Sequence, residues 1–382
     1  MNLVALKMLV GDRLKYLALV AGVSFAALLI TQQASIFMGF ALQTGAWIRE
    51  SSVADLWVMD EQVEFSEDFK PVSEMMLQRV RGVEGVEWAV PMYKNYLRTR
   101  LPDGTLVQTR IVGLDDATLT GGPPEMVVGR VADLRQDRAV LVNIDQANEM
   151  LRLKRDGNRP LQLGDRISIN DSEAVVVGFY RAQREFFWDP VIYTTWSRAL
   201  AMAPPQRKQL TFVLVRAQPG VKLSELSERI RQATGLAAYT NAEFEQRTMT
   251  DILQKTGILV NFGITIALGF VIGLLVAGQT FYTFVLDNLR HFGALKAMGL
   301  SNARVMGMLS LQVLVVAMLG YGLGVGFAAL AGRLLSVVNL AFNMGWQIPV
   351  IGAVAVLVCC FIAGLLGMWR VVRLEPAIVF KS

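Results

Sequence analysis

Very few side chains in this sequence have the types and spacing that catalysis or metal binding requires. The 382 residues contain one histidine, His291, and two cysteines, which are adjacent at Cys359 and Cys360. A single histidine excludes a multi-histidine metal site and a histidine-based catalytic triad. The two cysteines lie in an apolar run and cannot crosslink a separate domain. We therefore expect no catalytic residue and no metal site, and we interpret His291 as a solvated loop residue.

Carboxylates and nucleotide-binding patterns offer no clear alternative chemistry. Four carboxylates follow one another closely at Glu61, Glu64, Glu67 and Asp68, and such a run is more often a solvated surface than a calcium or hydrolase site. The pattern Gly-x-x-x-x-Gly-Lys-Ser/Thr, whose backbone cradles nucleotide phosphates, is absent from the sequence. We therefore expect no ATP hydrolysis by this chain and no cofactor in it, so energy for any work has to come from elsewhere.

Composition indicates a membrane protein with a large aqueous part. Hydrophobic residues make up 53% of the chain, its mean hydropathy is +0.41, and 18% of its residues are charged. Four runs contain no Asp, Glu, Lys or Arg and are long enough to cross a bilayer, which takes about 20 residues. These runs cover residues 17–40, 257–286, 305–332 and 348–369. The first is longer than the apolar core of a signal peptide, so we interpret all four as membrane spans.

Basic residues around the spans predict the orientation of the chain. They precede the first span, separate the second from the third, and follow the fourth, at Lys7, Arg13, Lys15, Arg290, Lys296, Arg304, Arg370, Arg373 and Lys381. The third and fourth spans have only Arg333 between them. The positive-inside rule then places residues 1–16, 287–304 and 370–382 in the cytoplasm and residues 41–256 outside. These cations account for much of the net charge of +5, so we predict no nucleic-acid partner.

The external region is predicted to be an α+β domain that folds without disulfides. Strand and helix patterns alternate at its two ends, which favours a split ferredoxin-like part over residues 41–114 and 210–256. Residues 115–209 are richer in short strand patterns and are interpreted as a β-rich insertion. Within it, Leu163–Ile167 is typical of the first hairpin of a small barrel or sandwich. The expected strands and helices cover residues 54–60, 72–81, 86–100, 106–114, 139–142, 166–169, 174–180, 210–216, 223–233 and 236–240.

Two segments beside the spans have helical patterns of their own. Residues 31–49 extend the first span outward, and residues 241–255 lead into the second. If both continue as uninterrupted helices, they form a stalk between the outer domain and the membrane. The alternative is a pair of flexible tethers.

A charged segment between the second and third spans carries an apolar stripe. Leu289, Phe292 and Leu295 recur every three residues and so share one helix face, while Arg290 and Lys296 point elsewhere. An ordinary short loop needs no such stripe. We therefore expect a helix that lies against the membrane or a protein, with Phe292 outside the core formed by the spans.

Glycines mark a turn and a packing surface. Gly299 suits a left-handed position after this helix, and Ser301 suits the residue just before the third span. Four further glycines lie inside that span, where we interpret them as helix-packing positions rather than as a nucleotide loop. They are Gly320, Gly322, Gly324 and Gly326.

Ionisable side chains are missing from all four spans, which argues against a proton- or ion-coupled carrier. The amides that remain inside or beside the spans are interpreted as partners in hydrogen bonds between helices. They are Gln32, Gln33, Asn261, Gln279 and Gln312.

From Asp287 to Ser301 the sequence resembles the MacB/FtsX family of ABC transporter permeases. Members of that family carry a segment of the type Glu-Arg-x-Arg-Glu-Ile-Gly-x-Leu-Arg-Ala-Leu-Gly-Ala-Ser after the second span. His291 departs from it by removing an acidic side chain. The matching residues are Arg290, Gly293, Leu295, Ala297, Gly299 and Ser301. The segments Leu6–Lys15 and Arg373–Ala377 are similar to the family's amphipathic N-terminal helix and its cytoplasmic tail.

The resemblance implies an inner-membrane, multi-pass permease of the mechanotransmission class, named type VII, nearest to its DevC-like or haem-exporter-like branch. It implies a homodimer above two copies of a separate ATPase, which binds ATP and Mg, and, in a diderm bacterium, a periplasmic adaptor and an outer-membrane duct. The residues expected to couple to the ATPase are Leu289, Arg290, Phe292, Gly293, Leu295, Lys296 and Gly299.

Under this reading the permease is not an enzyme and exports a hydrophobic or amphipathic molecule such as a lipid, haem, peptide or drug. The alternative is a transmembrane signal transmitter that regulates a cell-wall hydrolase or a sensor. A membrane-bound enzyme is a third alternative, which the scarcity of catalytic side chains disfavours.

Overall fold

The computed structural model describes residues 2–51, 53–337 and 340–372, and it divides the chain into two compact units. One unit is formed by residues 1–40 together with residues 256–382, and the other by residues 41–255. The predicted tail over residues 370–382 lies outside the described residues from position 373 onward.

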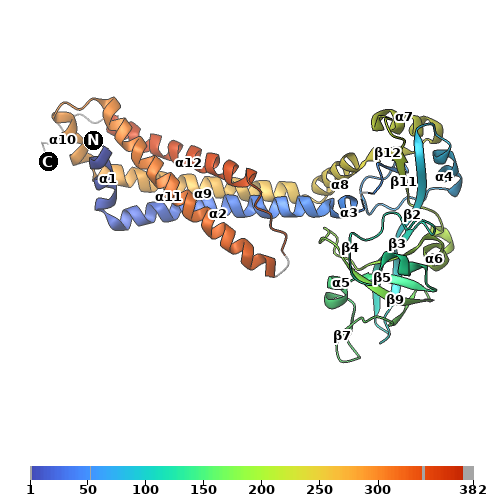
Figure 1. Cartoon of the computed structure of the whole chain (residues 1–382). Helices are drawn as coiled ribbons and strands as arrows, with labels where there is room; N and C mark the ends of the chain where they lie inside the picture. Colours follow the sequence, from blue (N-terminus) through green and yellow to red (C-terminus); the bar gives the residue numbers. More distant parts are fainter. Residues whose placement is uncertain (1, 52, 338–339, 373–382) are drawn as a thin grey trace. The chain divides into compact units, whose positions relative to one another are not determined.

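The first unit is helical. Among the residues that the structure describes, four helices are long and apolar enough to cross a membrane: α2 (Arg13–Thr44), α9 (Ile258–Asp287), α11 (Asn302–Val337) and α12 (Gln347–Val372). In this unit α12 packs against both α9 and α11 (Figure 1). Two short helices complete it, α1 (Asn2–Gly11) and α10 (Leu289–Ala297). The prediction of four spans with the outer domain between the first and second is confirmed.

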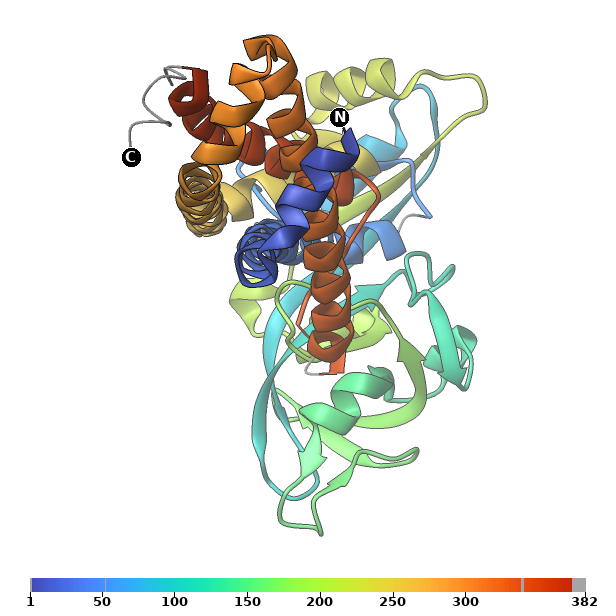
Figure 2. The same ribbon diagram turned by 90° about the vertical axis from the view of Figure 1, so that its left-hand side faces the viewer.

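The core of this unit receives side chains from all six helices. They include Leu9, Val23, Phe281, Phe292, Val316 and Cys360. The N-terminal helix α1 contacts α11 and crosses it in Figure 2. Contrary to expectation, α1 is apolar on two faces rather than amphipathic. Ala5 and Leu9 are buried, whereas Val4 is 47% exposed and Val10 48% exposed. The reason is its composition, because Lys7 is the single charged residue in the helix.

The second unit contains the predicted split ferredoxin-like part. Two strand-helix-strand segments form it: β1 (Leu56–Met59), α4 (Glu74–Arg81), β2 (Val86–Arg100), then β11 (Phe212–Ala217), α7 (Leu223–Thr234) and β12 (Ala237–Thr240). The strand order is β12-β1-β11-β2, and each neighbouring pair is antiparallel. Apolar residues of α4 and α7, such as Val80 and Leu226, form one core with this sheet.

The insertion is a small closed barrel. Its strands are β2, β3 (Leu106–Leu114), β10 (Val191–Thr195), β5 (Ala139–Asn143), β9 (Ser172–Arg181) and β8 (Arg166–Ile169), and β8 closes the ring by pairing with β2. Apolar side chains such as Leu97, Val142, Ile167 and Ile192 fill the barrel. The small-barrel interpretation of Leu163–Ile167 is therefore confirmed over the sandwich.

Shorter elements complete the outer domain. They are β4 (Glu125–Val128), η1 (Val131–Arg135), α5 (Ile144–Glu149), β6 (Arg152–Leu153), β7 (Arg159–Pro160), α6 (Trp196–Met202), η2 (Pro205–Arg207), α3 (Ala46–Glu50) and α8 (Asn241–Lys255).

One strand belongs to both sheets. The first half of β2 pairs with β11 up to Met92, and its second half pairs with β3 from Tyr93 onward. The insertion therefore begins within β2, and β3 belongs to the barrel rather than to the ferredoxin-like part, so the expected border after residue 114 does not follow the sheets. Pairing partners far along the chain decide this border, and the local strand pattern does not reveal them.

Candidate functional site

The helix between the second and third spans is α10, and its buried face differs from our expectation. Phe292 is fully buried in the core of the helical unit, with Leu289 packed at the edge of that core. The prediction that Phe292 lies outside the core of the spans is therefore wrong. The stripe packs inward because α10 folds back against α9, and the apolar side chains of this core offer a better partner than water.

The opposite face of α10 is the one available to another protein. It exposes Arg290, His291, Ala294 and Ala297, and Met298 just after the helix is 72% exposed. Of the residues that we expected to couple to an ATPase, Arg290 and Gly299 are exposed, Leu295 and Lys296 are partly buried, and Phe292 and Gly293 are buried.

The turn after α10 has the predicted left-handed glycine. Gly299 has φ +90°, a conformation that costs glycine little. The amide of Gly299 donates to the carbonyl of Lys296 (2.9 Å), and the amide of Leu300 donates to the carbonyl of Leu295 (3.1 Å). These two bonds satisfy carbonyls at the end of the helix. α11 then begins at Asn302, directly after Ser301.

The start of α10 is held by polar contacts. Lys15, at the beginning of α2, forms an ion pair with Asp287, the last residue of α9. Asn288 donates from its Nδ2 to the carbonyl of Phe284 (2.9 Å). A carboxylate just before a helix also interacts favourably with the positive end of its dipole. The position of α10 is thus tied to the first membrane helix as well as to the second.

Two of the four span glycines lie at a tight contact between helices. A Cβ built on Gly320 would lie 2.7 Å from the Cβ of Val23, and one built on Gly324 would lie 2.5 Å from the Cβ of Ala27. Gly322 and Gly326 have nothing within 4 Å of such a Cβ, so in the described residues they are not packing positions. Residues four apart share a helix face, while residues two apart point to different sides.

Gln312 forms the predicted type of hydrogen bond between helices. It is fully buried in α11 and donates from Nε2 to the carbonyl of Ala5 in α1 (2.6 Å). This bond fixes α1 on the helical unit.

Both segments that were expected to continue the spans are helical but interrupted. On the first, α2 ends at Thr44 and α3 begins at Ala46. On the second, α8 ends at Lys255, and Gly257 with φ +67° precedes α9. Neither alternative holds in full, since both segments are helical but not continuous with the spans. The second is interrupted because the left-handed Gly257 cannot continue a right-handed helix, and the first by a turn at Gly45.

Inside the outer domain, α3 and α8 are held by an aromatic cluster. The ring of Trp57 on β1 lies 5.2 Å from that of Trp47 on α3 and 5.6 Å from that of Phe244 on α8, measured between centroids. Trp57 Nε1 donates to Oδ1 of Asn241 (2.6 Å). Arg49 and Glu245 add an ion pair between the two helices.

Three buried charges and one partly buried charge lie beside this cluster. Glu67 accepts from Lys94 Nζ (2.5 Å) and from Arg110 Nη1 (2.9 Å), and Arg110 Nη1 also bonds Glu185 (2.5 Å). The side chains of Lys94 and Arg110 are fully buried, and that of Glu67 is 5% exposed. Glu67 is therefore not part of a solvated acidic surface, and that interpretation was wrong for it, although Glu61 and Glu64 are exposed.

Burial lowers the pKa of Lys94, since the ammonium loses its hydration, and the Glu67 carboxylate acts in the opposite direction. Burial also acts to lower the pKa of Arg110, but the carboxylates of Glu185 and Glu67 outweigh it and raise that pKa. Sequence reasoning missed this network. A basic residue directly before an apolar strand segment, as at Arg110 before Ile111 and Val112, is a signal that could have revealed it.

The same network holds the connection between β9 and β10. Arg110 Nη2 donates to the carbonyls of Phe187 (2.6 Å) and Asp189 (3.2 Å). The amide of Phe186 donates to the carbonyl of Gln43 (3.1 Å). The amide of Gln183 donates to Glu50 (2.7 Å). The barrel is thus connected through this loop to the helical segment around α3.

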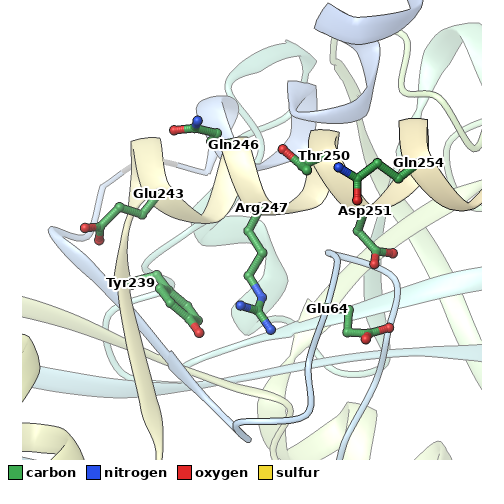
Figure 3. A pocket seen from close by; sticks show the side chains of 8 residues that line it. All are labelled: Glu64, Tyr239, Glu243, Gln246, Arg247, Thr250, Asp251 and Gln254. Carbon is green, nitrogen blue, oxygen red and sulfur yellow. The ribbon is translucent and has the colours of Figure 1, made fainter. Parts of the chain in front are cut away.

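A shallow polar pocket of about 460 Å³ lies along α8 (Figure 3). Figure 3 shows Arg247 pointing between Tyr239 and Glu64. Arg247 Nε donates to the carbonyl of Val63 (3.1 Å), and Glu64 forms an ion pair with Lys255. No group of three His, Cys, Asp or Glu side chains suited to a metal ion occurs in the described part of the chain. The contacts of Arg247 and Lys255 in this pocket connect α8 to the loop after β1.

The described residues thus contain four long apolar helices, a sheet-rich domain between the first two, and a short helix between the second and third. The family described as "MacB-like periplasmic core domain" matches residues 17–233, and the one described as "FtsX-like permease C-terminal" matches residues 263–376. The chain belongs to the MacB/FtsX family of ABC transporter permeases and is a multi-pass membrane protein.

Curated relatives carry the same class name. An "uncharacterized ABC transporter permease" of Mycobacterium tuberculosis H37Rv is 30% identical over 133 residues, which is 35% of this chain and 37% of that protein. A second one of the same strain is 30% identical over 138 residues, again 35% of this chain and 37% of the relative. The match thus spans little more than a third of each relative.

Two solved structures are similar to the outer part of the chain. The periplasmic region of MacB from Actinobacillus actinomycetemcomitans has a TM-score of 0.36 at 11% identity, covering 52% of this chain and 94% of that one. The extracellular domain of the noncanonic ABC-type transporter YknZ from Gram-positive bacteria has a TM-score of 0.34 at 14% identity, covering 49% and 98%.

Proposed function

We propose that this chain is the permease subunit that couples ATP hydrolysis by a separate cytoplasmic ATPase to movements of its outer domain, which drive export of a hydrophobic or amphipathic molecule. The observation that carries the proposal is the exposed face of α10, with Arg290, Ala294 and Met298, on a helix whose other face is anchored in the core of the spans. A displacement of a helix anchored in this way, caused by a bound ATPase, is transmitted to the helices that hold it.

The packing of the outer domain allows it to respond to such a movement as a unit. α3 and α8 share the cluster of Trp47, Trp57 and Phe244, and β2 belongs to both sheets. A displacement of α3 or α8 therefore acts on both sheets. Close-packed interiors transmit strain rather than absorb it. A homodimer, a periplasmic adaptor and an outer-membrane duct are part of the same proposal.

The proposal requires cytoplasmic termini and an external domain. Single cysteines test this orientation in a Cys359→Ala/Cys360→Ala background. An impermeant external thiol reagent is expected to label Ser172→Cys and not Ser301→Cys. Labelling at position 301 without labelling at 172 contradicts the orientation.

The ATPase requirement is tested by purification. We expect the chain to co-purify with a P-loop ATPase, and we expect the verified pure chain to hydrolyse no ATP, because it lacks the phosphate loop. Hydrolysis by the pure chain, or the absence of any ATPase from gently solubilised preparations, overturns the proposal.

A further inference from the structure

A charge-balanced cavity of about 500 Å³ lies where α1, α2, α9 and α10 meet. Its polar lining consists of Lys7, Asp12, Lys15, Asp287, Asn288 and His291. Two ammonium groups thus face two carboxylates, next to one amide and one imidazole. The mechanism proposed above makes no use of this cavity.

The cavity lies at the depth where the apolar spans end. Lys15 is followed by the charge-free run 17–40, and Asp287 follows the charge-free run 257–286. The ion pair between Lys15 and Asp287 holds these two boundaries at one level. In a bilayer, that level is the polar layer of lipid headgroups next to the hydrocarbon.

Exposed apolar side chains surround this level. Leu14 is 79% exposed and Leu17 is 61% exposed at the base of α2, and about half of Val4 and Val10 is exposed on α1. Apolar groups on a short helix beside a span are stabilised by lying among the upper parts of acyl chains. Lipid is therefore the natural neighbour of the cavity.

The polar groups that line the cavity differ in whether they already have hydrogen-bond or ion-pair partners. Lys15 is engaged by Asp12 (3.2 Å) and by Asp287. Across the described residues, Lys7 and His291 have no hydrogen-bond or ion-pair partner and remain able to donate. Each carboxylate still has lone pairs beyond its bond to Lys15. The cavity thus offers both donors and acceptors to a ligand.

We propose that this cavity binds the headgroup of a phospholipid that carries a phosphate and a primary ammonium, as phosphatidylethanolamine does. Lys7 and His291 bind the phosphate, and Asp12 and Asp287 accept hydrogen bonds from the ammonium. A purely anionic headgroup has no ammonium to donate to the remaining lone pairs of Asp12 and Asp287. A trimethylated ammonium has no N–H to donate and favours aromatic cages.

Native mass spectrometry of the detergent-purified full chain tests this proposal with three lipids of identical acyl chains: phosphatidylethanolamine, phosphatidylcholine and phosphatidylglycerol. We expect phosphatidylethanolamine to be retained roughly tenfold more than either of the others, a ratio that corresponds to ~1.4 kcal/mol. Equal retention of the three lipids, or a preference for one of the other two, overturns the proposal.

Two substitutions locate the site without disturbing the core. Lys7→Gln/His291→Gln alters exposed side chains and leaves the Lys15–Asp287 pair in place, so the chain is expected to keep its melting temperature and lose the lipid preference. Lys154→Gln, an exposed lysine in the outer domain, is the matched control and is expected to keep that preference. An unchanged lipid preference in the double variant contradicts the assignment. The assignment is also contradicted if an added ATPase protects Lys7→Cys from thiol labelling while the three lipids are retained equally.

Discussion

The ammonium of Lys94 on β2 lies 3.4 Å from the ring centroid of Trp47 on α3. This contact connects the strand shared by both sheets to the helical segment that follows the first span. Lys94 also bonds Glu67 and the carbonyl of Ser66. The position of α3 is therefore fixed by a desolvated cation as well as by ring packing.

Replacing Trp47 tests the contact with Lys94. Trp47→Leu removes the ring under the ammonium and the packing against Trp57 and Phe212, and it is expected to destabilise the outer domain by about 3 kcal/mol. Trp47→Phe keeps a smaller ring and is expected to cost about half as much. Denaturant unfolding of the full chain measures the stability of both variants. A Trp47→Leu protein as stable as wild type contradicts a stabilising role for the contact.

The buried charges predict strong non-additivity between Arg110 and Glu185. Arg110→Met leaves the buried Glu67 and the partly buried Glu185 without their guanidinium, which is expected to cost about 3–5 kcal/mol. Adding Glu185→Gln removes one of the stranded charges and is expected to restore part of that loss. A double variant as unstable as the sum of the two single variants shows that the two side chains act independently.

Glu50 predicts a pH dependence of stability. Burial raises the pKa of Glu50 above its ordinary value of 4.5, and the charge of Glu185 acts in the same direction. The unfolded chain therefore releases this proton at lower pH than the folded chain, so stability from Glu50 falls as pH rises through the window above 4.5. Glu50→Gln keeps an acceptor for the Gln183 amide, and it is expected to remove this decline and leave stability at pH 7.5 equal or higher.

Melting temperatures between pH 4.5 and 7.5 measure this effect. Glu84→Gln, at an exposed glutamate in the same domain, is the control and is expected to keep the wild-type slope. A Glu50→Gln protein with the wild-type slope refutes the role of Glu50.

The two faces of α10 predict opposite defects. Phe292→Asp places a charge in the core of the spans and is expected to prevent folding, whereas Met298→Asp changes an exposed residue and is expected to weaken ATPase binding at least about tenfold in a folded protein. Met75→Asp, at a methionine that is 61% exposed in the outer domain, is the matched control. Pull-down of the co-purifying ATPase and size-exclusion profiles separate the outcomes, and full binding by Met298→Asp would falsify the docking face.

The span glycines predict a difference between neighbouring positions. Gly324→Leu meets the Cβ of Ala27 and the backbone of Leu28 and is expected to lower the yield of folded protein severely. Gly322→Leu points into open space and is expected to be tolerated. Yields and melting temperatures of the two variants measure this, and equal behaviour rules out the packing role of Gly324.

The sequence by itself determined the spans and much of the outer domain. Membrane crossing needs only a long charge-free run, and residues 17–40 and 257–286 provide it whatever lies beside them. The ends of β2 and β3 also followed from local chemistry, because Pro102-Asp103-Gly104 forces a turn in which Gly104 has φ +85°. The left-handed conformation of Gly299 was likewise predictable from the local sequence.

Only the tertiary structure decided which faces and charges are buried. A three-residue period shows that Leu289, Phe292 and Leu295 share a side, but it does not say whether that side meets the spans or a partner. Likewise, Glu67 and Glu64 lie in one acidic run, and only Glu67 is buried, since Lys94 and Arg110 reach it from strands that are distant in sequence. Burial of a charge depends on partners that the fold brings together, and no local pattern records them.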